Sequence, residues 1–112
     1  MSRRDPEIAL DQILSHAREA VGLCQGRTRA DLDEDRLLNL ALSRLIEIIG
    51  EAANRVPDSI QERYPDLPWL YMISSRNRLI HGYDSVDFDI LWAIVNHDLP
   101  PVIARLESIL GE

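Results

Sequence analysis

The residues best suited to chemistry lie in one short segment, residues 76–83, which reads RNRLIHGY. Histidine titrates near neutral pH, so His81 can take a proton from a ribose 2′-hydroxyl or give one to a leaving 5′-oxygen. Arginine can hold a phosphate through two hydrogen bonds and stabilise the charge that gathers on it during reaction. Arg76 and His81 therefore have the chemistry needed to cleave RNA without a metal ion or other cofactor.

The charge of the whole chain restricts which partners this segment can have. The 112 residues carry a formal net charge of −7, and all twelve basic residues are arginine. An acidic chain is a poor general binder of nucleic acid, because phosphate contacts dominate that affinity. RNA binding would need a local basic patch, and residues 67–83 supply one, with Arg76, Arg78 and His81 but no Asp or Glu. We expect Arg78 to contact phosphate beside Arg76.

Length and composition predict a single domain over residues 1–112. The first apolar stretch is interrupted by acidic residues, unlike a signal peptide, and no apolar run approaches the roughly 18 residues of a membrane helix. The one cysteine, Cys24, cannot form an internal disulfide and is expected to be buried. These features favour a cytoplasmic protein that does not enter a membrane.

The first helix is predicted over residues 5–26. Asp5 is a suitable N-cap, Pro6 suits the first helical position, and Gly26 can end the helix. Its apolar residues recur at a spacing of three and four, which is typical of an amphipathic helix.

The second helix is predicted over residues 33–55, and Pro57 stops it. Gly50 lies inside this helix at a cost in helix propensity, so we expect another helix to pass close to it. A short helical turn follows, capped by Asp58 or Ser59.

The last helix is predicted to begin after Asp87, its N-cap. Pro100 and Pro101 interrupt its pattern, and a fresh start at Asp98 would place both prolines in a first turn, where missing N–H groups cost little. Together the helical patterns and short connections predict an all-α fold, an antiparallel bundle of four to five helices.

The remaining helix, predicted over residues 66–82 with Pro68 in its first turn, carries the basic segment. Arg76 falls on the apolar face of this helix, between Ile73 and Ile80. Because a charged group is costly to bury unless it is paired, Arg76 either meets a carboxylate or faces a partner or ligand. Glu47 and Glu51 of the preceding helix are the candidate carboxylates, and the two alternatives stay open.

His81 follows Arg76 by five residues, about 140° around an ideal helix, so their side chains diverge. They could converge if the helix unwinds at Gly82, or if a two-fold dimer brings two copies of the segment together. The simpler interpretation of His81 is a cationic residue that stabilises the end of a helix.

Tyr83 is either an amphipathic residue at the edge of the bundle or a hydroxyl that accepts a transferred group. Asp84, Asp87 and Asp89 are better explained by capping and a polar loop than by a metal site, because no standard ligand spacing is present. His16 and His97 have no second ligand nearby in the sequence, and we expect both to face solvent.

Taken together, these residues resemble the HEPN-domain ribonucleases. Arg76, four intervening residues and His81, with polar Asn77 after the arginine, match the signature of that domain, and Tyr83 extends it to the Arg-x4-His-x-Tyr form of HepT-like toxins. The flanking segments RLIEIIGEAANRVPDSIQERYPDLPW and DFDILWAIVNHDLPPVIARLESIL are also similar to this family, so the resemblance covers nearly the whole chain.

The resemblance implies a HEPN-like helical bundle that forms a homodimer, with the motifs of both copies in a composite cleft. It implies a metal-independent endoribonuclease that is the toxin of a type VII toxin–antitoxin pair. Arg76 and His81 would be catalytic and Asn77 would support them. A cognate minimal nucleotidyltransferase antitoxin would silence the toxin by transferring AMP to Tyr83. The acidic surface suits a restricted RNA substrate, such as a transfer RNA end, or a bundle that binds a nucleotide or the nucleotidyltransferase without cutting RNA.

Overall fold

The computed structural model describes residues 5–79 and 85–112, and every regular element along them is helical. In chain order these elements are α1 (Asp5–Leu23), α2 (Asp31–Glu34), α3 (Arg36–Arg55), α4 (Asp58–Arg63), α5 (Trp69–Ile73), α6 (Ser75–Leu79), α7 (Phe88–Ala93), the π-helical segment η2 (Ile94–Asp98) and α8 (Leu99–Leu110).

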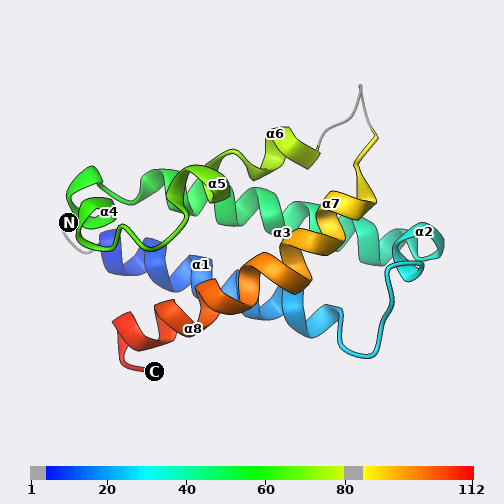
Figure 1. The fold of residues 1–112 in the computed structure, drawn as a ribbon, viewed down its shortest axis with the longest axis horizontal. Helices are drawn as coiled ribbons and strands as arrows, with labels where there is room; N and C mark the ends of the chain where they lie inside the picture. The colour runs from blue at the N-terminus through cyan, green and yellow to red at the C-terminus, as the bar shows by residue number, and fades with distance from the viewer. Residues whose placement is uncertain (1–4, 80–84) are drawn as a thin grey trace.

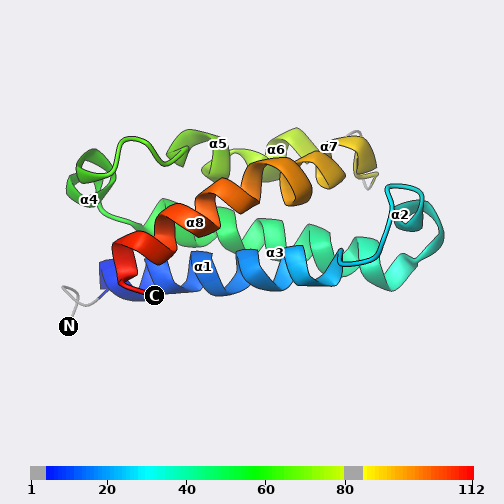
Figure 2. The ribbon, with the colours of Figure 1, turned by 60° about the horizontal axis from the view of Figure 1, so that its bottom comes forward.

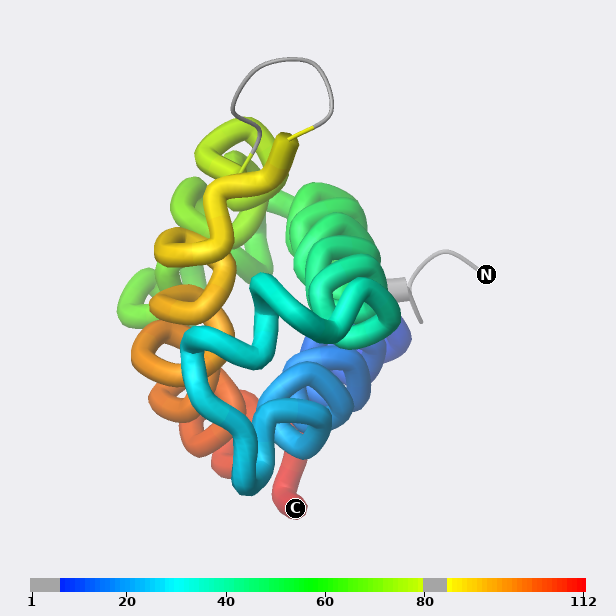
Figure 3. The backbone as a smooth tube through the Cα atoms, turned by 90° about the vertical axis from the view of Figure 1, so that its right-hand side faces the viewer, coloured from blue at the N-terminus to red at the C-terminus, as the bar shows by residue number. Residues whose placement is uncertain are grey.

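The helices form an antiparallel bundle (Figures 1 and 2). α1 and α3 run side by side in opposite directions, α5 and α6 return along α3, and α7, η2 and α8 form the last layer, which packs back onto α1. Viewed along the long axis, these columns surround one interior and α2 crosses an end (Figure 3). The predicted all-helical bundle is confirmed for the described residues, although it contains more and shorter helices than expected.

The interior is apolar and draws on every column of the bundle. Its largest fully buried side chains are Ile13, Leu14, Leu32, Leu42, Ile46, Leu91, Ile94, Val95 and Leu106. Cys24 is buried and free, as predicted. None of the helices in the described part of the chain combines the length and hydropathy of a membrane-spanning helix.

α3 begins later than the sequence pattern indicated. The predicted start near residue 33 is wrong, because the chain first makes the separate turn α2 and then breaks at Asp35, whose backbone is extended. The Asp35 side chain accepts a 3.1 Å hydrogen bond from the Leu38 N–H, which caps α3. At its other end α3 stops before Pro57, as predicted, with Val56 in an extended conformation.

The short helix α4 is present where expected, but its predicted capping is wrong. Its N-cap is Pro57, and no side chain caps the helix. Asp58 and Ser59 are the first two residues of α4 itself, so neither occupies the N-cap position. The Gln61 side chain instead donates to the Val56 carbonyl at 3.0 Å, which ties α4 to the end of α3.

The predicted helix over residues 66–82 is divided in two. α5 ends at Ile73, Ser74 interrupts the backbone with ψ near 2°, and α6 begins at Ser75. The hydroxyl groups of Ser74 and Ser75 donate to the carbonyls of Leu70 and Tyr71, at 2.7 and 2.8 Å. Side-chain bonds of this kind compete with the helical ladder and favour a break.

Pro100 and Pro101 predicted an interruption of the last helix, and the structure has the π-helical segment η2 there. The Leu99 N–H bonds to the Ile94 carbonyl, five residues back, and α8 then starts at Leu99. Pro100 has no N–H and its ring would clash with the carbonyl four residues earlier, so the wider turn relieves both problems. At the other end Asp87 caps α7, as predicted.

Candidate functional site

Residues 76–79 of the basic segment lie on α6, at the surface of the bundle above α3 (Figure 1). Arg76 and Asn77 are exposed, Arg78 is half-buried and Leu79 is buried. His81 and Tyr83, the other predicted site residues, lie outside the described residues. The chain on both sides of them is held together by a 2.9 Å hydrogen bond from the Asp87 N–H to the Leu79 carbonyl.

The break at Ser74 changes which residues of α6 face the core. The inward positions are taken by Ser75 and Leu79, at 4% and 2% exposure. Arg76 is therefore not on an apolar face, and the side chain is 66% exposed. The prediction that Arg76 occupies the apolar face is wrong, because it assumed one continuous helix through residue 74.

Arg76 does pair with a carboxylate, and the partner is Glu47, one of the two predicted candidates. The Arg76 Nε lies 2.9 Å from Glu47 Oε2. The second oxygen of the same carboxylate, Oε1, accepts a 3.1 Å hydrogen bond from Arg44 Nη1, three residues earlier on α3. Glu47 thus joins two arginines from different helices. These residues border an open pocket of about 250 Å³ whose apolar wall includes Leu40 and Val86.

Arg78 points to a different neighbour. Its guanidinium carbon lies 3.5 Å from the centre of the Tyr71 ring, and Nη2 donates to the Ser75 hydroxyl at 3.0 Å and the Tyr71 carbonyl at 3.3 Å. Its Nε is buried with no hydrogen-bond partner among the described residues. The structure therefore does not bring Arg76 and Arg78 together: one contacts α3, the other α5.

The Tyr71 hydroxyl extends this second cluster to η2, where it donates to Asp98 Oδ2. Burial raises the pKa of Tyr71, the bond to Asp98 raises it further, and the nearby Arg78 cation opposes both effects. Tyr71 and Asp98 are 27 residues apart in the chain, and no sequence pattern indicated their contact. The Arg44–Glu47 pair, by contrast, has the spacing of neighbours on a helix and could have been anticipated.

The other residues weighed for chemistry lie apart from Arg76. No group of three metal-ligating side chains occurs among the described residues, which include Asp87 and Asp89 but not Asp84. His97 is exposed, whereas His16 is half-buried and its Nδ1 lies 2.7 Å from the Gln12 carbonyl. The pKa of Cys24 is raised, chiefly by burial, which disfavours its reactive thiolate form.

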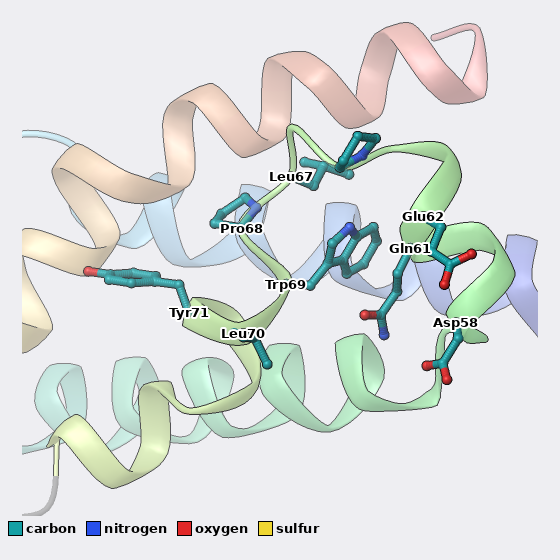
Figure 4. A pocket seen from close by; sticks show the side chains of 9 residues that line it. Asp58, Gln61, Glu62, Leu67, Pro68, Trp69, Leu70 and Tyr71 are labelled. Atoms are coloured by element: carbon teal, nitrogen blue, oxygen red, sulfur yellow. The ribbon is translucent and has the colours of Figure 1, made fainter.

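A second, larger pocket of about 480 Å³ lies between α4 and α5 (Figure 4). Trp69 and Gln61 face it, Asp58 and Glu62 add carboxylates at its rim, and the ring of Tyr71 points away toward the last layer. This pocket contains no arginine or histidine among the described residues that line it, so the residues suited to phosphate chemistry are those on α3 and α6.

The fold and these contacts define a helical bundle with an exposed arginine–glutamate cluster at its surface. Residues 11–109 match the family described as Ribonuclease HepT-like, and the chain belongs to that family.

Two relatives show the extent of the similarity. The protein of Methanocaldococcus jannaschii named "Putative RNase MJ1380" is 32% identical over 109 residues, which cover 97% of this chain and all of the relative. The protein of Thermococcus cleftensis named "Probable ribonuclease HepT" is 36% identical over 95 residues, covering 81% of this chain and 86% of the relative. No solved structure matches the chain.

Proposed function

We propose that this chain is a metal-independent endoribonuclease and the toxin of a type VII toxin–antitoxin pair. Membership of the HepT-like ribonuclease family carries the proposal. The exposed Arg76 guanidinium, free of the core and beside an open pocket, is consistent with a group that meets RNA.

Arg76 and His81 divide the chemistry, with Asn77 in a supporting role. His81 takes the proton of the ribose 2′-hydroxyl, and the oxygen attacks the adjacent phosphorus. The bond from phosphorus to the 5′-oxygen breaks, a cyclic 2′,3′-phosphate remains, and the leaving 5′-oxygen takes the proton that His81 has gained. Arg76 stabilises the negative charge on the phosphate. Because Arg78 is held by Tyr71 and Ser75, we assign it to support of α6 rather than to first contact with RNA.

A homodimer is part of the proposal, with the His81 of one copy acting beside the Arg76 of the other. Leu37 and Leu40 support it, because these large apolar side chains are 79% and 48% exposed on α3. Leu40 also borders the pocket that contains Arg76. Neighbouring exposed apolar side chains are typical of protein interaction surfaces.

Control by a cognate nucleotidyltransferase completes the proposal. The Tyr83 oxygen would bond to the α-phosphorus of ATP and pyrophosphate would leave, so that AMP remains on the tyrosine. This group would add bulk and negative charge two residues from His81, and would repel RNA phosphate. Both proteins would act in the cytoplasm.

The decisive experiment replaces the proposed proton carrier. His81→Ala should abolish RNA cleavage and growth arrest, while light scattering shows the same oligomer as the parent. His97→Ala is the matched control, because His97 is an exposed histidine on η2 and is not among the proposed site residues. Full cleavage by His81→Ala would rule out this function. Cleavage should also persist in a chelator, and loss of activity there would restore the aspartates as metal ligands.

The proposed control has its own test. Co-expression with a nucleotidyltransferase encoded beside this chain should add adenylyl increments to its intact mass, and Tyr83→Phe should remove them. Tyr64→Phe, which alters another tyrosine, should keep them.

The net charge of −7 weakens general binding of RNA, so the alternative is a bundle that binds a nucleotide or the nucleotidyltransferase without cutting RNA. Purified protein that binds either one but never cuts RNA, transfer RNA included, would support this alternative.

A further inference from the structure

The Glu47 carboxylate is shared between two arginines. Oε2 lies 2.9 Å from Arg76 Nε on α6, and Oε1 accepts from Arg44 Nη1 on α3 at 3.1 Å. Glu47 is 31% exposed, whereas Arg44 and Arg76 are 61% and 66% exposed. The carboxylate therefore lies deeper than both guanidinium groups. Two arginines and one glutamate leave a net positive charge at this point of an acidic chain.

Each arginine keeps donors that this carboxylate does not use. Arg76 meets Glu47 through Nε, which leaves its two Nη groups, and Arg44 uses only Nη1. Within residues 5–79 and 85–112, neither guanidinium is paired with a second carboxylate. The pair of N–H groups on a guanidinium edge matches two oxygens of a phosphate.

The pocket beside these groups has both features that a nucleotide needs. Its volume is about 250 Å³, and both arginines are among the residues that line it. Leu40 and Val86 also line it and provide apolar surface for a base. A metabolite that is purely anionic would not use this apolar wall, so an RNA phosphate with its base fits the lining better.

We infer that Arg44 is a second phosphate-binding residue for RNA, and that Glu47 is a positioning residue that holds Arg44 and Arg76 side by side. This inference rests on the proposed ribonuclease function and extends it to α3. Arg44 contacts the RNA backbone, while Glu47 does not touch the substrate and acts through the two arginines.

The test for Arg44 measures binding to a fluorescein-labelled single-stranded RNA of about 12 nucleotides. His81→Ala is the background, so that the RNA stays intact, and the salt concentration is varied. Arg44→Ala should weaken binding on the order of tenfold, and should reduce the slope of log affinity against log salt by about 0.7, the effect of one lost phosphate contact. Arg44→Lys should keep the slope and recover part of the affinity.

Arg63→Ala is the matched control. Arg63 is an exposed arginine on α4, at the opposite end of α3 from α2, so this variant makes the same change of charge away from the pocket (Figure 1). An Arg44→Ala variant with the same affinity and slope as Arg63→Ala would overturn the assignment of Arg44.

The test for Glu47 uses the cleaving protein. Glu47→Gln removes a negative charge beside the phosphate, so the KM for RNA should fall roughly two- to fivefold. Since the arginines lose their common anchor, kcat should fall about tenfold. A merely structural role would not move KM and kcat in this way. Glu51→Gln, which changes an exposed carboxylate one turn further along α3, should alter neither value. Unchanged kinetics in Glu47→Gln would overturn the positioning role.

The outcomes separate this inference from the function on which it rests. If the parent cuts RNA and Arg44→Ala behaves as Arg63→Ala does, the inference fails alone. If the parent neither binds nor cuts RNA, both fail. If Arg44→Ala converts a dimer to a monomer in light scattering while the parent's RNA affinity and salt slope are kept, Arg44 serves the contact between copies and its assignment to RNA is overturned.

Discussion

The Met72 carbonyl oxygen lies against the backbone of Gly50, so close that a Cβ at position 50 would approach it to 2.9 Å. Contacts of that length are not found for real Cβ atoms, and the obstacle is backbone rather than a flexible side chain. α5 can therefore pack against α3 only because residue 50 is glycine. This contact sets the distance between α5 and α3. Because α6 follows α5 directly along the chain, the contact also affects the position of Arg76.

The first prediction follows from this contact. Gly50→Ala should lower the free energy of unfolding by about 1–3 kcal/mol, the usual cost of forcing extra volume into a packed site. It should also reduce RNA cleavage, because α5 must move and α6 moves with it. Urea unfolding and a cleavage assay measure the two effects.

Gly22→Ala is the control for Gly50→Ala. Gly22 lies in α1, and a Cβ there would meet nothing within 4 Å. Alanine should therefore stabilise the helix by about 0.5–1 kcal/mol. Equal effects of the two substitutions on the free energy of unfolding would show that the close approach of the Met72 carbonyl does not determine the effect of Gly50→Ala.

The Gly50 contact was predictable because a glycine that interrupts a strong helical pattern commonly marks the close approach of another segment. The N-cap at Asp87 and the end of α3 before Pro57 were predictable from the residues at those positions, and Glu47 was one of the two carboxylates expected as a partner for Arg76. Each depends on residues close in sequence or on the pairing of opposite charges.

The division of α5 from α6 was not predictable from periodicity. The apolar pattern continues through residue 74, and the break depends on two serine hydroxyls that bond to the preceding turn. Serine in a helix has this option but does not always use it. This break matters for the site, because Arg76 lies at the surface and not on the apolar face where one continuous helix would have placed it.

The second prediction concerns the helix that follows the motif. Asp87 Oδ1 accepts hydrogen bonds from the N–H groups of Asp89 and Ile90, at 3.0 and 3.1 Å. Asp87→Ala should lower the free energy of unfolding by about 1 kcal/mol, the usual value of a lost N-cap. Asp87→Asn keeps the capping oxygen and should restore most of the loss. If Asn were as destabilising as Ala, the cap would not explain the role of Asp87.

The third prediction concerns acid stability. Arg27 lowers the pKa of Asp35, with help from the Leu38 N–H, and Arg105 lowers the pKa of Asp66. A carboxyl with a lower pKa in the folded state binds fewer protons when folded than when unfolded. Its contribution to stability is therefore fully present above the unfolded pKa of about 4, and is lost as the pH falls toward the folded pKa.

We accordingly expect the free energy of unfolding to decline as the pH falls below about 4, and to decline less steeply in Asp66→Asn. Urea unfolding followed by circular dichroism at several pH values measures both slopes. Asp58→Asn is the control, because Asp58 has no ion pair among the described residues. A parent slope that matches the Asp66→Asn slope would contradict the prediction.

The fourth prediction separates the two arginines of α6. Arg76→Gln removes an exposed ion pair and should change the free energy of unfolding by less than about 1 kcal/mol, yet it should abolish RNA cleavage. Arg78→Gln removes the contact with the Tyr71 ring and two hydrogen bonds, and should cost about 1–2 kcal/mol. The Arg78→Gln variant should lose cleavage activity only to the extent that the loss of these contacts displaces α6. Urea unfolding and the cleavage assay on both variants test this division. The reverse result, a stable Arg78→Gln variant that cannot cut RNA, would indicate that Arg78 contacts the RNA substrate.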